Sequence, residues 1–170
     1  MKNIFLKKKR LKGLSRDEGN KVYVVDTSVL IEYLDETSPF AKDIELLFNK
    51  AIQGEVVLCT TTLVVAELLY VASRLYREFN IPNPNEKAFE YITWLKEYVK
   101  LRVYDLDDKL ALRIGELKKK LRIALTDCSV IALAEILNAI PLFKRVENEM
   151  KPILNELRKL GVKFLEDRLK

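Results

Sequence analysis

Apolar positions along the chain form short continuous runs that alternate with segments of helical spacing. The run from Val22 to Val25 is apolar on both faces and rich in β-branched residues, which predicts a buried strand of a parallel sheet. Similar short runs predict four further strands. These lie near residues 55–60, 101–104, 139–143 and 162–165.

Between these runs, apolar residues recur every three or four positions, as they do on one face of a helix. Start and stop signals delimit the segments: Pro39 and Gly54 bound one, Thr61 or Thr62 can cap the next, and Asp107 and Thr126 can cap two others. The predicted helices cover residues 28–34, 39–54, 63–79, 86–98, 107–121, 126–138 and 147–160. Strands alternating with helices predict an α/β domain with a mainly parallel sheet.

The composition fits one such domain. The chain has 170 residues, of which 49% are apolar, enough for a sizeable core. We place a single domain at residues 22–167, since neither a repeat nor a domain break is visible. No apolar stretch reaches the roughly 20 residues that span a membrane, and the start does not resemble a signal peptide, so a cytoplasmic protein is expected. Cys59 and Cys128 are expected to be buried free thiols.

Positive charge is concentrated in residues 1–21. This segment has eight lysines and arginines against two acids, whereas the remainder has 22 against 23. We interpret it as a flexible basic arm. Such an arm either steers the protein to nucleic acid or an anionic surface or is simply a solvated terminus.

Three acidic residues stand beside apolar runs: Asp26 ends the first predicted strand, and Glu67 and Asp127 lie in early turns of predicted helices. A carboxylate among packed apolar side chains is costly unless it is compensated. Ligands of open parallel sheets bind beyond the carboxyl ends of the strands, where all three could converge on a shared cation. Each also has a structural alternative: Asp26 as a turn cap, Glu67 as a partner of Arg74, and Asp127 as a first-turn dipole partner.

The chain contains no histidine and no Cys-x-x-Cys motif, which excludes histidine bases and the usual zinc ligands. Any bound metal would therefore have oxygen ligands, which favours Mg²⁺ or Mn²⁺. Such a site predicts an enzyme acting on phosphate esters.

Three motifs resemble the PIN-domain family of ribonucleases, and within it the VapC toxin type. They are Val25-Asp26-Thr27-Ser28, Ala66-Glu67-Leu68 and the stretch from Leu125 to Ala134, which contains Asp127. The resemblance runs from about residue 22 to 165. It implies a three-layer α/β/α sandwich, an endoribonuclease that depends on Mg²⁺ or Mn²⁺, often a small antitoxin partner, and a homodimer.

The family pattern includes a fourth acid after the penultimate strand, often as Asp-x-x-Phe. Here Glu147 with Met150 fits that spacing, and Glu149 is the second candidate. The resemblance implies that Asp26 and Asp127 bind the metal directly. Glu67 would bind the metal or a metal-bound water, and Glu147 would be an outer ligand.

Two hydroxyl residues and two basic residues complete the candidate site. Ser28 and Thr126 stand beside two of the acids and either orient a carboxylate or water or cap a helix. Lys144 and Arg145 precede Glu147 and are candidates for RNA phosphate contacts.

The sequence therefore predicts a metal-dependent endoribonuclease that cleaves RNA by in-line attack of a metal-activated water, as the toxin of a toxin–antitoxin pair. One alternative is a housekeeping RNA-processing nuclease. The other is a catalytically weak PIN-like module that binds RNA or protein, because Glu147 departs from the family's Asp.

Overall fold

A five-stranded, all-parallel sheet forms the centre of the molecule, with helices on both faces, as the sequence predicted. The computed structural model describes residues 20–168, so the basic arm lies almost entirely outside the described residues. The strand order is β3-β2-β1-β4-β5. The strands are β1 (Lys21–Val25), β2 (Val56–Thr61), β3 (Arg102–Tyr104), β4 (Ile140–Phe143) and β5 (Lys163–Phe164).

Strand β1 lies in the middle of the sheet and pairs with β2 and β4. Val24 is in register with Cys59, and Val25 with Leu142. The ladder continues past the strand end, because the Asp26 N–H donates to the Leu142 carbonyl at 3.1 Å. Since all strands run the same way, the segments that follow β1, β2 and β4 leave the sheet at one edge.

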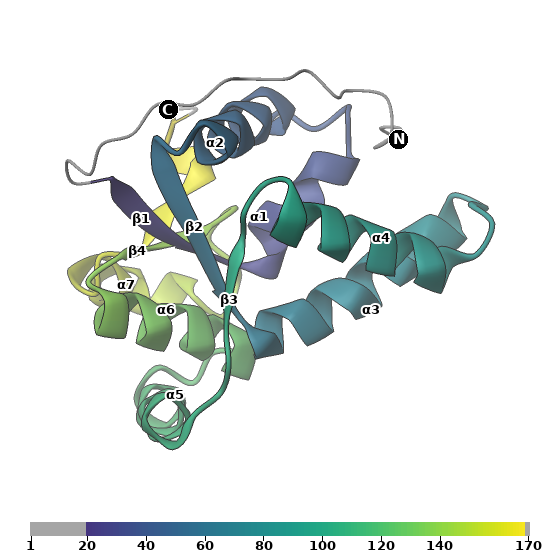
Figure 1. Ribbon diagram of the computed structural model, residues 1–170. Coiled ribbons are helices and arrows are strands. Elements are labelled where there is room, and N and C mark those ends of the chain that lie inside the picture. Colours follow the sequence, from purple (N-terminus) through teal and green to yellow (C-terminus); the bar gives the residue numbers. More distant parts are fainter. Residues whose placement is uncertain (1–19, 169–170) are drawn as a thin grey trace.

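Each face of the sheet is covered by its own helices (Figure 1). Helix α6 (Leu125–Leu137) packs on β1, β2 and β4, with α5 (Asp108–Leu121) outside it. Helix α6 is buried from Asp127 to Ala134, which explains why its sequence is apolar on nearly every side. Helices α1 (Thr27–Ile31) and α2 (Ala41–Gln53) belong to the other face, where α2 packs on β2.

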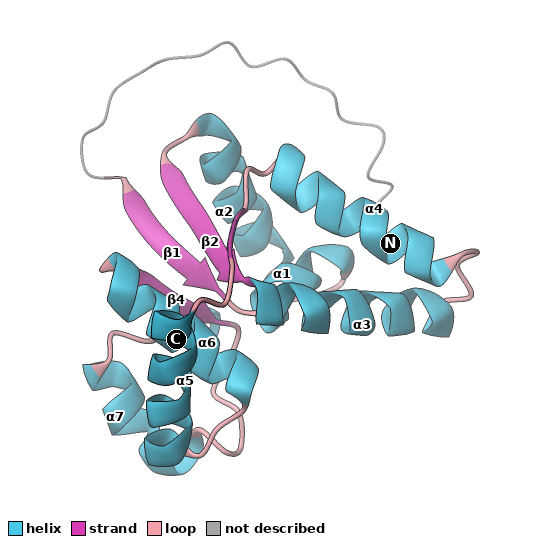
Figure 2. Ribbon diagram, turned by 60° about the horizontal axis from the view of Figure 1, so that its bottom comes forward, coloured by secondary structure: helices cyan, strands magenta, loops and turns pink. Residues whose placement is uncertain are grey.

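Helices α3 (Thr62–Glu78) and α4 (Pro84–Glu97) form a hairpin that projects from the body of the molecule (Figures 1 and 2). Its base is held by aromatic packing: the Trp94 and Tyr33 rings stack with their centroids 4.9 Å apart. The Tyr91 hydroxyl donates to the Leu30 carbonyl at 2.5 Å. This bond fixes α4 to α1, the helix that follows Asp26.

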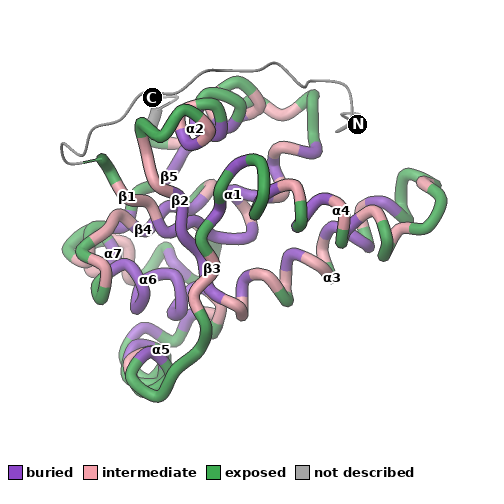
Figure 3. Tube along the Cα trace, viewed as in Figure 1, coloured by how far each residue is buried: buried purple, intermediate pink, exposed green. Residues whose placement is uncertain are grey.

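Burial follows the layers, with the sheet and α6 at the centre of the core (Figure 3). Cys59 and Cys128 are free and buried, as predicted. In the described part of the chain, no helix has the length and apolarity needed to cross a membrane.

Two local predictions were wrong. The helix predicted for residues 147–160 begins later: a turn and the 3-10 helix η3 (Lys151–Ile153) precede α7 (Leu154–Lys159). Pro152 explains the delay, because proline disfavours the α conformation of the residue before it. Thr126 does not cap α6, whose N-cap is Ala124. The 3-10 helix η4 (Leu165–Arg168) is the last element of the described residues.

Candidate metal-dependent nuclease site

Four carboxylates from four distant segments line one cavity of about 260 Å³ at the carboxyl edge of the sheet. Asp26 follows β1, Glu67 lies on α3, Asp127 lies on α6 and Glu147 follows β4. The rest of the lining consists of Thr27, Ser28, Ile31, Val71, Ala124 and Thr126. The structure thus brings all four predicted acids to one place.

Asp26 combines a structural contact with its place in the cavity. Its Oδ2 accepts the Ser28 N–H at 2.8 Å, so it is the N-cap of α1. Burial raises the pKa of the Asp26 carboxyl, bonds to Ser28 oppose the rise, and the charge of Glu67 adds to it. The capping bond fixes the direction of the carboxylate.

Glu67 is held by a residue that the sequence analysis missed. The Thr27 hydroxyl donates to Glu67 Oε2 at 2.5 Å, across 40 positions of sequence. The only sequence signal for Thr27 is its place beside Asp26. Arg74, the alternative partner, pairs instead with Glu78 at 3.4 Å.

Asp127 is the least compensated of the four acids. Its residue is 7% exposed, and its Oδ2 is buried without a hydrogen-bond partner among residues 20–168. Burial, followed by the charges of Asp26 and Glu147, raises the pKa of its carboxyl to about 8. A proton, an ordered water or a bound ion would each satisfy this oxygen.

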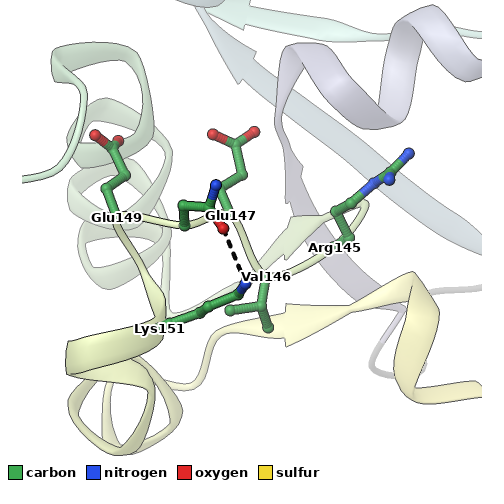
Figure 4. Close-up of a pocket in the computed structure, with 6 residues that line it drawn as sticks. Arg145, Val146, Glu147, Glu149 and Lys151 are labelled. Atoms are coloured by element: carbon green, nitrogen blue, oxygen red, sulfur yellow. Dashed lines mark hydrogen bonds between the residues drawn. The ribbon is translucent and has the colours of Figure 1, made fainter.

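The loop after β4 separates the two candidates for the fourth acid. Glu147 lines the carboxylate cavity. Glu149 Oε1 instead accepts the Ala124 N–H at 2.9 Å, at the start of α6. Figure 4 shows the two side chains extending in the same direction from neighbouring points of the loop. Both lie near Asp127, but only Glu147 also faces the other three acids.

Four contacts hold the beginning of this loop. The Lys144 N–H donates to Ser28 Oγ at 3.2 Å, so Ser28 contacts this loop as well as Asp26. Glu166 holds the other side, since its N–H donates to the Lys144 carbonyl and its Oε1 accepts the Val146 N–H. Finally, the Lys144 ammonium forms an ion pair with Glu32, which also accepts the Ser38 hydroxyl.

These contacts distinguish Lys144 from Arg145, the two residues predicted to contact RNA phosphates. The Glu32 carboxylate is buried, and the Lys144 side chain is only 19% exposed and lies 5.8 Å from the Phe40 ring centroid. The ammonium of Lys144 is therefore committed to an internal ion pair rather than presented to a phosphate. Arg145 is exposed.

The Thr126 side chain lines the cavity, and the Thr126 carbonyl anchors α6 to the start of α3. Ser129 Oγ donates to this carbonyl at 2.6 Å and lies 2.8 Å from Thr61 Oγ1. Thr61 in turn caps α3 by accepting the Val64 N–H at 3.3 Å. This network places Asp127 and Glu67 relative to each other.

The residues present suit a hard divalent cation. All donors at the cavity are oxygens, and the unpartnered Asp127 oxygen is the type of ligand that Mg²⁺ or Mn²⁺ takes. Within residues 20–168, no three acids or cysteines already lie close enough together to hold a metal. The Thr27 hydroxyl donates to one oxygen of Glu67 and leaves the other as an acceptor.

A five-stranded, all-parallel sheet flanked by helices is a PIN-like fold. The family model described as "PIN domain" matches residues 23–145, and the chain belongs to this family. PIN domains are typically nucleases and generally use a divalent metal. No curated protein matches the sequence significantly.

The solved structures similar to this chain include VapC toxins of VapBC systems. VapBC2 from Rickettsia felis, bound to a promoter DNA fragment, has 17% identity and a TM-score of 0.58, covering 84% of this chain and 98% of that chain. VapBC-1 from nontypeable Haemophilus influenzae has 18% identity and a TM-score of 0.56, covering 84% and 97%. Mycobacterium tuberculosis VapC20, a toxin that cleaves the sarcin–ricin loop, has 14% identity and a TM-score of 0.53, covering 69% and 84%.

Proposed function

We propose that the protein is a metal-dependent endoribonuclease whose active site is the carboxylate cavity. The observation that carries the proposal is the buried Asp127 oxygen without a partner, among three further acids that converge from separate segments. Such charges repel one another strongly unless a cation lies between them. PIN-family membership supports phosphodiester hydrolysis as the chemistry.

The proposed roles follow from the contacts. Asp26 and Asp127 bind the cation directly, since one is oriented by Ser28 and the other has a free oxygen. Glu67, whose Oε2 accepts the Thr27 hydroxyl, would bind the cation or its water shell, and Glu147 would be the outer ligand. A bound Mg²⁺ or Mn²⁺ would lower the pKa of a water and neutralise charge on the phosphate.

We further propose that the protein is the toxin of a toxin–antitoxin pair, with a small antitoxin as its partner and a homodimer as its assembly. Structural neighbours crystallised as toxin–antitoxin complexes support this role. Induced expression of the chain in bacteria should arrest growth, and co-expression of a small antitoxin-like reading frame, if one lies immediately upstream of the gene, should relieve the arrest. Normal growth under induction would favour a housekeeping nuclease.

Cleavage of a mixed, structured RNA pool tests the proposed activity. Purified protein should cut RNA in Mg²⁺ or Mn²⁺ and stop in EDTA. Asp26→Asn and Asp127→Asn should each lower the rate at least about 100-fold, because each removes a charged ligand. Asp105→Asn, a matched change at an exposed loop acid, should leave the rate unchanged. Absence of cleavage in either metal by folded protein would contradict the proposal and favour a binding module.

Metal addition should stabilise the fold in a pH-dependent manner. Because a carboxyl must lose its proton to bind metal, Mg²⁺ should raise the melting temperature more at pH 8 than at pH 5. At about 100-fold excess over the dissociation constant, the gain is roughly 2.7 kcal/mol. Differential scanning fluorimetry measures the shift. If Mg²⁺ raised the melting temperature of Asp127→Asn as much as that of the wild-type protein, the metal would bind elsewhere.

A further inference from the structure

A second cavity lies directly beside the carboxylate cavity and shares Glu147 with it. Its volume is about 640 Å³. It is lined by residues of the loop after β4 and the start of η3, namely Arg145, Val146, Glu147, Asn148, Glu149 and Lys151. Small-molecule sites usually measure about 300–1,000 Å³, so a nucleotide fits this volume. Because Glu147 belongs to both cavities, a strand crossing the first can continue into the second.

Arg145 is the available cation of this cavity. It is exposed and has no hydrogen-bond or ion-pair partner among residues 20–168. Lys144 pairs with the buried Glu32, whereas the exposed Lys151 uses one of its three ammonium donors on Asn148 Oδ1 at 2.8 Å. A guanidinium presents a planar fork of N–H donors that matches a phosphate.

Beyond Glu147, the lining includes the carboxylate of Glu149. Glu149 uses one oxygen for the Ala124 N–H and retains the other as an acceptor. Figure 4 shows Arg145 extending on the opposite side of Glu147 from Glu149. The exocyclic amines of cytosine, adenine and guanine are donors that suit a carboxylate. The charge distribution therefore places a phosphate at Arg145 and a base edge toward Glu149.

We propose that this second cavity, lined by Arg145 and Glu149, is a subsite of a single-stranded RNA substrate. It would hold the nucleotide next to the cleaved bond. Arg145 holds the phosphate of that nucleotide and Glu149 faces its base. This subsite rests on the proposed nuclease function, because the shared Glu147 places it next to the proposed reacting centre. It gives the protein a contact with single-stranded substrate that lies outside the metal site.

RNA binding without cleavage tests the subsite. In an Asp127→Asn background, fluorescence anisotropy with a random single-stranded RNA of about 12 nucleotides gives the affinity at several salt concentrations. Arg145→Ala should weaken binding roughly tenfold. It should also lower the slope of log affinity against log salt by about 0.7, the value for one phosphate contact with a single strand. Arg145→Lys should keep the slope, because it keeps the charge.

Arg77→Ala is the matched control, since Arg77 is an exposed arginine near the end of α3 and lines neither cavity. If Arg145→Ala and Arg77→Ala weaken binding equally, or if no RNA binds, the subsite is overturned. If binding falls only in Arg145→Ala while wild-type protein cleaves no RNA, the subsite stands and the nuclease proposal fails. In a cleaving protein, Arg145→Ala should raise KM more than it lowers kcat.

Discussion

Asp127→Asn should raise the melting temperature of the metal-free protein at pH 8, although it removes the proposed metal ligand. The pKa of the buried carboxyl is about 8 in the folded protein and near 3.8 when the chain is unfolded. A group with a raised folded-state pKa stabilises the fold at low pH. That contribution is lost as pH rises from about 4 to 8, by at most about 1.4 kcal/mol per pH unit.

Asparagine has nearly the shape of aspartate but no charge, so the variant should lose this pH dependence. A gain of about 2 kcal/mol at pH 8 corresponds to roughly 4–8 °C in a chain of this length. Thermal unfolding in EDTA at pH 5 and pH 8 measures the effect, with Asp105→Asn as the exposed control. Lower stability of Asp127→Asn at both pH values would show that the carboxylate makes a structural contact.

Lys144→Met should destabilise the protein by about 3–5 kcal/mol, because it leaves the buried Glu32 charge without its cation. Glu32→Gln should cost less. This variant removes the charge of Glu32, the more deeply buried partner of the ion pair. The Lys144 side chain, already 19% exposed, can then turn toward water. The double variant Glu32→Gln with Lys144→Met should recover most of the loss, since no charge is then left buried.

Urea unfolding at pH 7 gives the three free energies of unfolding. A Lys144→Met variant no less stable than Glu32→Gln would refute the proposed asymmetry. The pair also joins the α1 side of the site to the loop that carries Glu147. The single Lys144→Met variant should therefore also weaken Mn²⁺ binding, measured by titration calorimetry on the folded fraction.

Much of the fold could be predicted from sequence because its signals are local. Short apolar runs gave all five strands, and the Asp107 cap of α5 and the Gly54 end of α2 lie where the sequence placed them. One error has a local cause, since Pro152 delays α7. The other does not: the side chain that accepts the N–H at the start of α6 comes from Glu149, 25 positions away, rather than from Thr126.

The four acids could be chosen from sequence because a carboxylate beside an apolar run is unusual. Their assembly in one cavity follows from parallel strands ending at one edge. The structural alternatives were partly true as well: Asp26 does cap α1, and Asp127 does lie in the first turn of α6. Asp26 can cap α1 and also line the cavity, since one of its two carboxylate oxygens accepts the Ser28 N–H and the other is left for the cavity. The metal-binding roles themselves stay predictions.

By itself the sequence determined the layers, the parallel sheet and the four acids, because periodicity and apolar runs are properties of neighbouring residues. Only the tertiary structure decided which groups hold those acids. The Thr27–Glu67 bond spans 40 positions, and the Ser28–Lys144 bond spans 116. Packing of α1 between β4 and α3 creates both contacts. The same packing buries Lys144 against Glu32 and leaves Arg145 exposed, a distinction between adjacent cations that no local pattern contains.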